Sequence, residues 1–326
     1  MKEQTKPKLV VAGSGAMGCL FGGLLAEGGL DVTLLDVWPE HIAAINQAGG
    51  LRFVGFGGER LVKLSATTDA STIKSADVVF FQCKALYNDA AAKSVRHLFD
   101  GGNAVAISFQ NGLGNEQVIA GVVGEKNVLA GLTSQAASIE GPGVVRNYAE
   151  LPSSIGELKA GLTERVSRLA KIFTEHGLPT EAKEDVIRDK WKKLFANISF
   201  SATSGATDLT LGEVAAHPEL RVIALRAIDE AAAVAAADGV DFTQEQAREI
   251  FHQLIGPNGS ATNKSSMCRD IHYRRPSEVD YIYGTVVTIG QKYKVPTPTL
   301  DALVAVIKGI ESHYVGKEPA KFAAVR

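Results

Sequence analysis

Short apolar runs alternate with segments of helical periodicity through the first half of the chain. The apolar runs predict strands at Lys8–Ala12, Asp31–Asp36, Asp77–Cys83 and Asn103–Phe109, and near 127–138, 143–149 and 153–158. Helices are predicted over Leu20–Ala26 and Pro39–Ala48, in segments ending at Phe99 and Val122, and over 162–176. Leu51–Phe56 and Arg60–Ser65 flank a Gly-rich turn, which predicts a hairpin. Strands separated by helices indicate a parallel sheet with helices on both faces.

The pattern changes near Glu184, and from there to Gly316 it is almost wholly helical. Helices are predicted near 185–204, 218–238, 243–254, 265–274, 277–293 and 299–313, with prolines punctuating them. The predicted fold class is therefore α/β, a doubly wound sheet of Rossmann type followed by an all-helical domain. We place the predicted boundary at residue 182, giving domains 1–182 and 183–326.

Composition narrows the function classes. Of the 326 residues, 45% are hydrophobic and the net charge is −2, which argues against a protein that works mainly by coating nucleic acid or an anionic membrane. No run of about 18 apolar residues occurs, and the polar N-terminus lacks a signal peptide's apolar centre. The three cysteines lie far apart without a CxxC pair, which favours a cytoplasmic protein with free thiols and no metal site.

A glycine-rich motif follows the first predicted strand. Gly13-Ser14-Gly15-Ala16-Met17-Gly18 matches GxGxxG, with a helix after it and Asp36 at the end of the next strand. The first glycine permits a tight turn, the second a close approach of pyrophosphate, and the third close helix–strand packing. The start of the helix presents unpaired N–H groups to phosphate. A glycine-rich turn without a ligand is the alternative, and the context of strand, helix and carboxylate favours a dinucleotide.

The all-helical second half favours a nicotinamide dehydrogenase over a flavoprotein. The Asp36 carboxylate is placed to accept hydrogen bonds from the adenosine ribose, and no arginine follows it directly. NAD(H) is therefore the predicted cofactor, with NADP(H) as the alternative. Arg52 or Arg60 in the hairpin would favour NADP(H) if either reached this point, and Asp36 acting only as a helix cap would leave the choice open.

A polar stripe runs along the first helix of the second half. Lys193, Asn197 and Ser201 are spaced i, i+4, i+8 and share one face of an otherwise apolar helix. Such a stripe meets solvent or lines a cleft. In a cleft, desolvation would lower the pKa of the lysine toward neutrality and make it a proton donor to a substrate oxygen.

A second polar cluster includes Asn263, Ser266 and Glu278. Ser277 is predicted to cap a helix with Asp280 as its capping-box partner, so that Glu278 in the first turn has either a functional role or a dipole-compensating one. In the first half, Asn111 and Lys84 each follow a predicted strand, at the sheet edge where ligands bind in open α/β folds.

Taken in order, these motifs resemble the ketopantoate reductases (2-dehydropantoate 2-reductases). The resemblance extends from about residue 8 to 313 and rests on Gly13–Gly18, Cys83-Lys84-Ala85, Gln110-Asn111-Gly112, Lys193–Asn197, and Asn263–Met267 with Glu278–Asp280. It implies a nicotinamide-dependent reduction of ketopantoate to (R)-pantoate, a step toward pantothenate and coenzyme A. It also implies an active site in the cleft between a Rossmann domain and a helical substrate domain, and, by analogy, a homodimer through the helical half.

The resemblance also assigns roles to residues. Lys193 matches the catalytic lysine that protonates the developing alkoxide, and Glu278 matches a position on the nicotinamide-ribose side, so these two are the predicted catalytic residues. The expected substrate-binding residues are Asn111, Asn197, Ser201, Asn263 and Ser266. The expected cofactor contacts are Gly13, Ser14, Gly15, Ala16, Met17, Gly18, Asp36, Lys84, Asn111, Ala137 and Glu278.

Two departures keep other functions open. The family usually has an asparagine where Ser201 stands, and its NADP-dependent members usually have an arginine after the second strand, where this chain reads Asp36-Val37-Trp38. One alternative is an NAD-dependent dehydrogenase of another D-2-hydroxy acid, similar to D-mandelate dehydrogenases. The other is an NAD(H)-binding redox sensor without turnover, which would have no need of a proton donor at Lys193.

Overall fold

The computed structural model describes residues 6–316, which form two compact units. The first unit contains residues 6–110 and 115–187, and the second contains 111–114 and 188–316. The predicted division at residue 182 assigned 111–114 to the first half, whereas the structure packs this short segment with the helical unit. The segment belongs there because the Leu113 N–H donates to the Tyr281 carbonyl and Thr285 Oγ1 donates to the Leu113 carbonyl.

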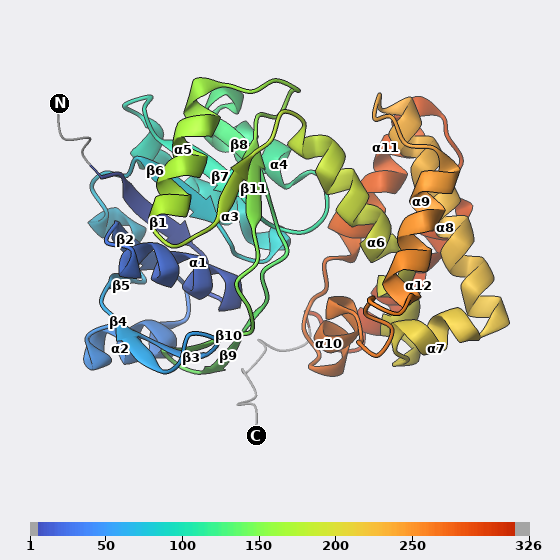
Figure 1. Ribbon diagram of the computed structural model, residues 1–326, viewed down its shortest axis with the longest axis horizontal. Helices are drawn as coiled ribbons and strands as arrows, with labels where there is room; N and C mark the ends of the chain where they lie inside the picture. Colours follow the sequence, from blue (N-terminus) through green and yellow to red (C-terminus); the bar gives the residue numbers. More distant parts are fainter. Residues whose placement is uncertain (1–5, 317–326) are drawn as a thin grey trace. The chain divides into compact units, whose positions relative to one another are not determined.

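An eight-stranded sheet forms the centre of the first unit (Figure 1). Its strands are β1 (Lys8–Ala12), β2 (Asp31–Leu35), β5 (Ser65–Thr67), β6 (Val78–Phe81), β7 (Val105–Ser108), β8 (Val128–Thr133), β11 (Ser153–Gly156) and β12 (Thr180–Ala182). Their order is β12-β11-β8-β7-β6-β1-β2-β5, and all neighbours are parallel except β11 and β8. The predicted Rossmann-type sheet is confirmed, although the edge strand β12 was not predicted.

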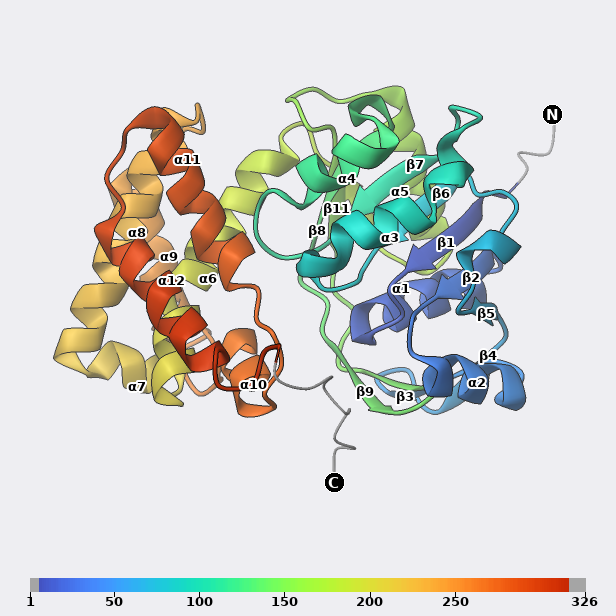
Figure 2. The same cartoon turned by 180° about the vertical axis from the view of Figure 1, so that it is seen from behind.

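Helices cover both faces of this sheet. On β1, Leu9 and Val11 belong to the core that includes Phe21 of α1 (Ala16–Glu27) and Phe173 of α5 (Glu164–Glu175). The alternate residues Val10 and Ala12 belong to the core formed with α3 (Asn88–Ser94) and α4 (Asn115–Val123). Figure 1 shows α1 and α5 in front of the sheet, and Figure 2 shows α3 and α4 from the other side. A strand buried on both faces has to be apolar throughout, which is why the sequence pattern was a continuous run.

A smaller four-stranded sheet accompanies the large one. Its order is β4 (Arg60–Val62), β3 (Leu51–Gly55), β10 (Val144–Asn147) and β9 (Ala137–Gly141). The β3–β4 hairpin is confirmed, but Ser65 begins β5 in the large sheet. The single strand predicted over 127–138 is wrong, because β8 and β9 lie in different sheets. Gln135 lies between them, and its backbone N–H bonds to Thr133 Oγ1 at 3.1 Å.

The remaining helical turns of the first unit are short, apart from α2 (Pro39–Ala48), which lies where it was predicted. The helix predicted to end at Phe99 is broken into η2 (Ala85–Tyr87), α3 and η3 (Arg96–Phe99). The break falls at Val95, whose φ of −105° and ψ of 7° are not helical. The other short turns are η1 (Ala70–Thr72) and η4 (Glu125–Asn127).

The second unit is helical, as predicted. Its elements are α6 (Val186–Thr207), α7 (Leu211–Ala216), α8 (Pro218–Ala237), α9 (Gln244–Ile255), α10 (Ser266–His272), η5 (Asp280–Gly284), α11 (Thr285–Tyr293) and α12 (Pro298–Glu311). Aromatic pairs bury α6: the Phe195 ring lies 5.1 Å from Phe242, and the Phe200 ring 4.7 Å from Phe251 on α9. The sequence pattern missed α7, whose six residues are too few to show periodicity. Within residues 6–316, no helix has the length and apolar character needed to cross a membrane.

Candidate functional site

The glycine-rich turn joins β1 to α1 in the first unit. Gly13 has a φ of +100°, and a Cβ there would lie 2.2 Å from the Cys83 backbone nitrogen. A Cβ on Gly18 would lie 1.9 Å from the Gly13 carbonyl oxygen, so the turn and the helix pack without space for side chains. A Cβ on Gly15 would meet nothing within 4 Å. The backbone is therefore open at Gly15, next to the first turn of α1, as pyrophosphate binding requires.

Asp36 is hydrogen-bonded directly to this turn. Its Oδ2 accepts from the Ser14 N–H at 2.5 Å, and its Oδ1 accepts from the Trp38 N–H at 3.0 Å, where α2 begins. The carboxylate thus links the end of β2, the glycine turn and the start of α2, and each oxygen keeps further acceptor capacity. Ser14 Oγ is buried without a protein partner, an orphaned polar atom within the turn that a bound phosphate could satisfy.

A buried chain of hydrogen bonds connects the smaller sheet to the same glycine turn. The Gly143 N–H donates to His41 Nδ1 at 3.1 Å, so the neutral ring carries its proton on Nε2 and donates to Cys19 Sγ at 3.3 Å. The Cys19 thiol donates to the Ser14 carbonyl at 3.0 Å. Burial lowers the pKa of His41 and raises the pKa of Cys19, which keeps both groups neutral. The smaller sheet therefore anchors the glycine turn.

Two other predicted cofactor contacts belong to this unit. Lys84 follows β6 directly after Cys83, whose carbonyl accepts from Gln110 Nε2 at 2.6 Å. Ala137 is the first residue of β9 and packs with Met17 against the core that contains α1. The glycine turn, the orphaned Ser14 hydroxyl and the Asp36 carboxylate together fit a nicotinamide dinucleotide.

The polar stripe of the second unit lies on α6. Lys193 and Asn197 are partly buried and Ser201 is 3% exposed, which does not match a solvated helix face. Burial is the largest cause that lowers the pKa of Lys193 to about 8; the positive charge of Lys190 lowers it further, and the Glu278 carboxylate opposes them. A lysine with this pKa is positively charged at neutral pH and still able to give up its proton.

Asn111 and Glu278 meet in the same unit, although they are far apart in sequence. Asn111 Nδ2 donates to Glu278 Oε2 at 3.4 Å. The segment is held there because the Leu113 N–H donates to the Tyr281 carbonyl at 3.0 Å and Thr285 Oγ1 donates to the Leu113 carbonyl at 3.1 Å. Lys193, Glu278 and Asn111 therefore form one group of a cation, a carboxylate and an amide.

The capping box predicted at Ser277 is wrong. The Ser277 N–H donates to Glu311 Oε1 at 2.7 Å instead of to Asp280, and Asp280 Oδ1 pairs with Lys308 Nζ at 2.7 Å. Ser277 Oγ accepts only from the nearby Val279 N–H. Two residues of α12 bind the groups that the capping box would have paired: Glu311 binds Ser277, and Lys308 binds Asp280. Local spacing does not reveal these distant partners.

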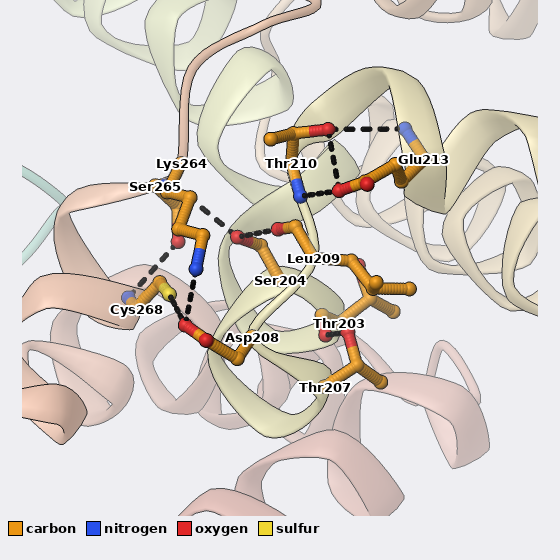
Figure 3. A network of polar contacts seen from close by, with 10 residues as sticks. All are labelled: Thr203, Ser204, Thr207, Asp208, Leu209, Thr210, Glu213, Lys264, Ser265 and Cys268. Atoms are coloured by element: carbon orange, nitrogen blue, oxygen red, sulfur yellow. Dashed lines mark hydrogen bonds and ion pairs between the residues drawn. The ribbon is translucent and has the colours of Figure 1, made fainter.

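The segment with Asn263 and Ser266 is fastened to the end of α6 (Figure 3). Ser265 Oγ donates to the Ser201 carbonyl at 3.2 Å, and the Ser265 N–H donates to Ser204 Oγ at 3.3 Å. On either side, Lys264 Nζ and Cys268 Sγ bond to Asp208 Oδ1 at 2.7 and 3.2 Å. Ser265 also caps α10, so its hydroxyl is engaged, whereas Asn263 and Ser266 in the same segment are exposed.

Sequence reasoning missed several residues that hold these groups in place. The buried His41, Lys190 and Tyr283 lie within helical patterns that looked like ordinary core or surface positions. Lys190 had one available signal, because it precedes Lys193 by three residues on the same helix.

Two family models match most of the chain. "Ketopantoate reductase PanE/ApbA" matches residues 9–160, and "Ketopantoate reductase PanE/ApbA C terminal" matches residues 185–311. A 2-dehydropantoate 2-reductase of Halobacterium salinarum is 31% identical over 305 residues, covering 92% of this chain and 98% of the relative. The matching enzyme of Lactococcus lactis is 29% identical over 308 residues, covering 93% and 98%.

Solved structures are similar over the same length. A D-mandelate dehydrogenase with NADH and anilino(oxo)acetate superposes with a TM-score of 0.87 at 26% identity, covering 94% of this chain and 99% of that one. A PanE/ApbA family ketopantoate reductase from Ralstonia eutropha JMP134 superposes with a TM-score of 0.84 at 30% identity, with the same coverage.

Proposed function

This chain belongs to the ketopantoate reductase family, and from that membership we propose that it is a nicotinamide-dependent reductase of a 2-keto acid, with ketopantoate as substrate and (R)-pantoate as product. The observation that carries the proposal is Lys193, a partly buried cation whose charge is felt by the carboxylate of Glu278, which in turn accepts from Asn111. A redox sensor would not need this group, so the family and the site both favour an enzyme.

Separate residues bind the cofactor and hold the proton. The glycine turn Gly13–Gly18 binds pyrophosphate, Asp36 accepts from the adenosine ribose, and Lys84 and Ala137 contribute further contacts. When bound, the nicotinamide supplies the hydride that reduces the keto carbon. Lys193 holds the proton that the keto oxygen receives, and Glu278 keeps that lysine charged.

The substrate carboxylate is assigned to the hydroxyls and amides of the second unit. Asn197, Ser201, Asn263 and Ser266 supply neutral donors, and Asn111 orients the reacting group. Binding of the carboxylate positions the keto carbon, and orienting the substrate is one of the contributions that a protein makes to a cofactor reaction.

A second candidate is a NAD-dependent dehydrogenase of a bulkier D-2-hydroxy acid. It is favoured by the similarity to a D-mandelate dehydrogenase solved with NADH and by Asp36 at the ribose position. The deciding experiment measures kcat/KM for ketopantoate and for aromatic 2-keto acids with each nicotinamide. Ketopantoate as the poorest substrate of the panel would overturn the first assignment.

We also propose that the enzyme acts as a homodimer and supplies pantoate for pantothenate and coenzyme A synthesis. Light scattering during size-exclusion chromatography tests the dimer. Complementation of a pantoate-requiring strain tests the metabolic role.

Replacing Ser266 with alanine should raise the KM for keto acid about 10- to 150-fold, because a hydrogen bond to a charged group contributes about 1.5–3 kcal/mol. The KM for the cofactor should stay the same. Steady-state kinetics with each substrate varied in turn provides the measurement, with Ser167→Ala on α5 as the control. An unchanged keto-acid KM would remove Ser266 from the site.

The pH profile should report Lys193 directly. The donor must be protonated, so keto-acid reduction should decline as pH rises through about 8, the pKa of Lys193. The Glu278 carboxylate raises this pKa and Lys190 lowers it, so Glu278→Gln should move the decline to lower pH and Lys190→Met to higher pH. Profiles of kcat/KM between pH 6 and 10 measure these shifts, since this range extends about two pH units to either side of the Lys193 pKa. Shifts in the same direction for both variants would contradict the assignment.

A further inference from the structure

Tyr283 is a fully buried tyrosine whose hydroxyl contacts the backbone of another helix. Its side chain lies in η5 and is 0% exposed. The hydroxyl accepts from the Ala202 N–H at 2.9 Å and donates to the Ile198 carbonyl at 2.9 Å. Burial raises the pKa of Tyr283, so the hydroxyl keeps the proton that it donates.

The two backbone groups are the ones that a regular α-helix pairs with each other, since the N–H of residue i bonds to the carbonyl of residue i−4. A side chain that bonds to both takes part in the helix's own ladder and can bend it locally. The place is significant, because Ile198 follows Asn197 and Ala202 follows Ser201 in the stripe. The hydroxyl therefore acts on the turn of α6 that separates these two residues.

Tyr283 also ends a segment that carries the other members of the site. Glu278 lies five positions before it, and the Tyr281 carbonyl in the same segment accepts from Leu113, which follows Asn111 and Gly112. The η5 turn is a π-helical turn, a geometry frequent at functional sites. Tyr283 thus connects the segment that carries Glu278, and holds Asn111, to α6, the helix with the polar stripe.

We propose that Tyr283 is a positioning residue for the keto acid, acting through the α6 turn that sets Ser201 relative to Asn197; this rests on the proposed function. Without the hydroxyl, the Ala202 N–H and the Ile198 carbonyl lose a buried partner. They then bond directly to each other, as in a regular helical turn. Ser201, and the Ser265 hydroxyl bonded to its carbonyl, then shift relative to Lys193.

Tyr283→Phe removes only the oxygen. We expect the KM for keto acid to rise about tenfold, the equivalent of one lost buried hydrogen-bond partner. The KM and Kd for NADH should stay unchanged, because the glycine turn and Asp36 lie in the other unit and the hydroxyl bonds to the backbone of α6, not to Asn111 or Glu278. KM does not depend on the concentration of folded enzyme, so partial unfolding does not imitate the effect. Tyr293→Phe, a partly exposed tyrosine at the end of α11, is the matched control.

A double-mutant cycle with Ser201→Ala tests the route of action. If Tyr283 acts through Ser201, the keto-acid KM of the double variant should be close to that of either single variant. Fully additive effects, or an unchanged KM in Tyr283→Phe, would overturn the proposal.

The contact itself is measurable in the wild-type protein, which keeps the proposal testable even where the variant does not fold. A slowly exchanging Tyr283 hydroxyl proton with an NMR cross-peak to the Ala202 amide is the expected result, and its absence in the folded protein overturns the proposal. Failure of the wild type to reduce any 2-keto acid would instead overturn the proposed function, with the NMR result still deciding the contact.

Discussion

Lys193→Ala is expected to lower kcat by about 10²–10⁴, the usual effect of removing a general acid, with little change in cofactor affinity. The reason is the pKa of about 8, which leaves the lysine charged at neutral pH yet ready to release its proton to an oxygen that is becoming an alkoxide. Single-turnover reduction of keto acid, followed by loss of NADH absorbance, isolates the step.

The neighbouring lysine offers a matched control. Lys192 is exposed on the same helix, so Lys192→Ala removes an equal charge without touching the site and should leave kcat unchanged. Near-normal turnover in Lys193→Ala would show that the stripe does not supply the proton and that the mechanism is wrong.

The second large effect concerns cofactor choice, where NADH is expected to exceed NADPH in kcat/KM. The Asp36 carboxylate lies at the end of β2, bonded to Ser14 and Trp38, where a 2′-phosphate would meet like charge. Arg60 is held elsewhere, by Glu27 at 2.7 Å and over the Phe53 ring. Val37, the residue after Asp36, is 93% exposed and brings no positive charge.

Asp36→Ala should raise the KM for NADH about 10- to 150-fold, since a hydrogen bond to a charged group contributes about 1.5–3 kcal/mol, and shift the ratio toward NADPH. Asp36→Asn removes the charge and keeps one of the two acceptor oxygens that hold Ser14 and Trp38, so its comparison with Asp36→Ala distinguishes charge repulsion from loss of the loop's anchor. Asp31→Ala, at the exposed start of β2, is the control. A wild-type kcat/KM with NADPH equal to or higher than that with NADH would contradict the expected preference for NADH.

Much of the first unit follows from local sequence. Strands buried on both faces must be apolar throughout, so β1 and β6 appear as continuous runs, and the glycines of the β1–α1 turn appear because no side chain fits there. The stripe on α6 follows in the same way from helical spacing, since Lys193, Asn197 and Ser201 repeat every four residues. These signals lie within a few residues of one another, and the sequence alone contains them.

What the sequence could not determine depends on partners far away along the chain. The Ser277 N–H bonds to Glu311, Asn111 donates to Glu278, and the Tyr283 hydroxyl bonds to α6, because tertiary packing brings these groups together over long separations. The pKa of Lys193 is of the same kind, because its burial and the nearness of the Glu278 carboxylate arise only when the helices assemble. Local spacing therefore determined which residues share a face, and only the tertiary structure decided which of them meet and how strongly their charges act on one another.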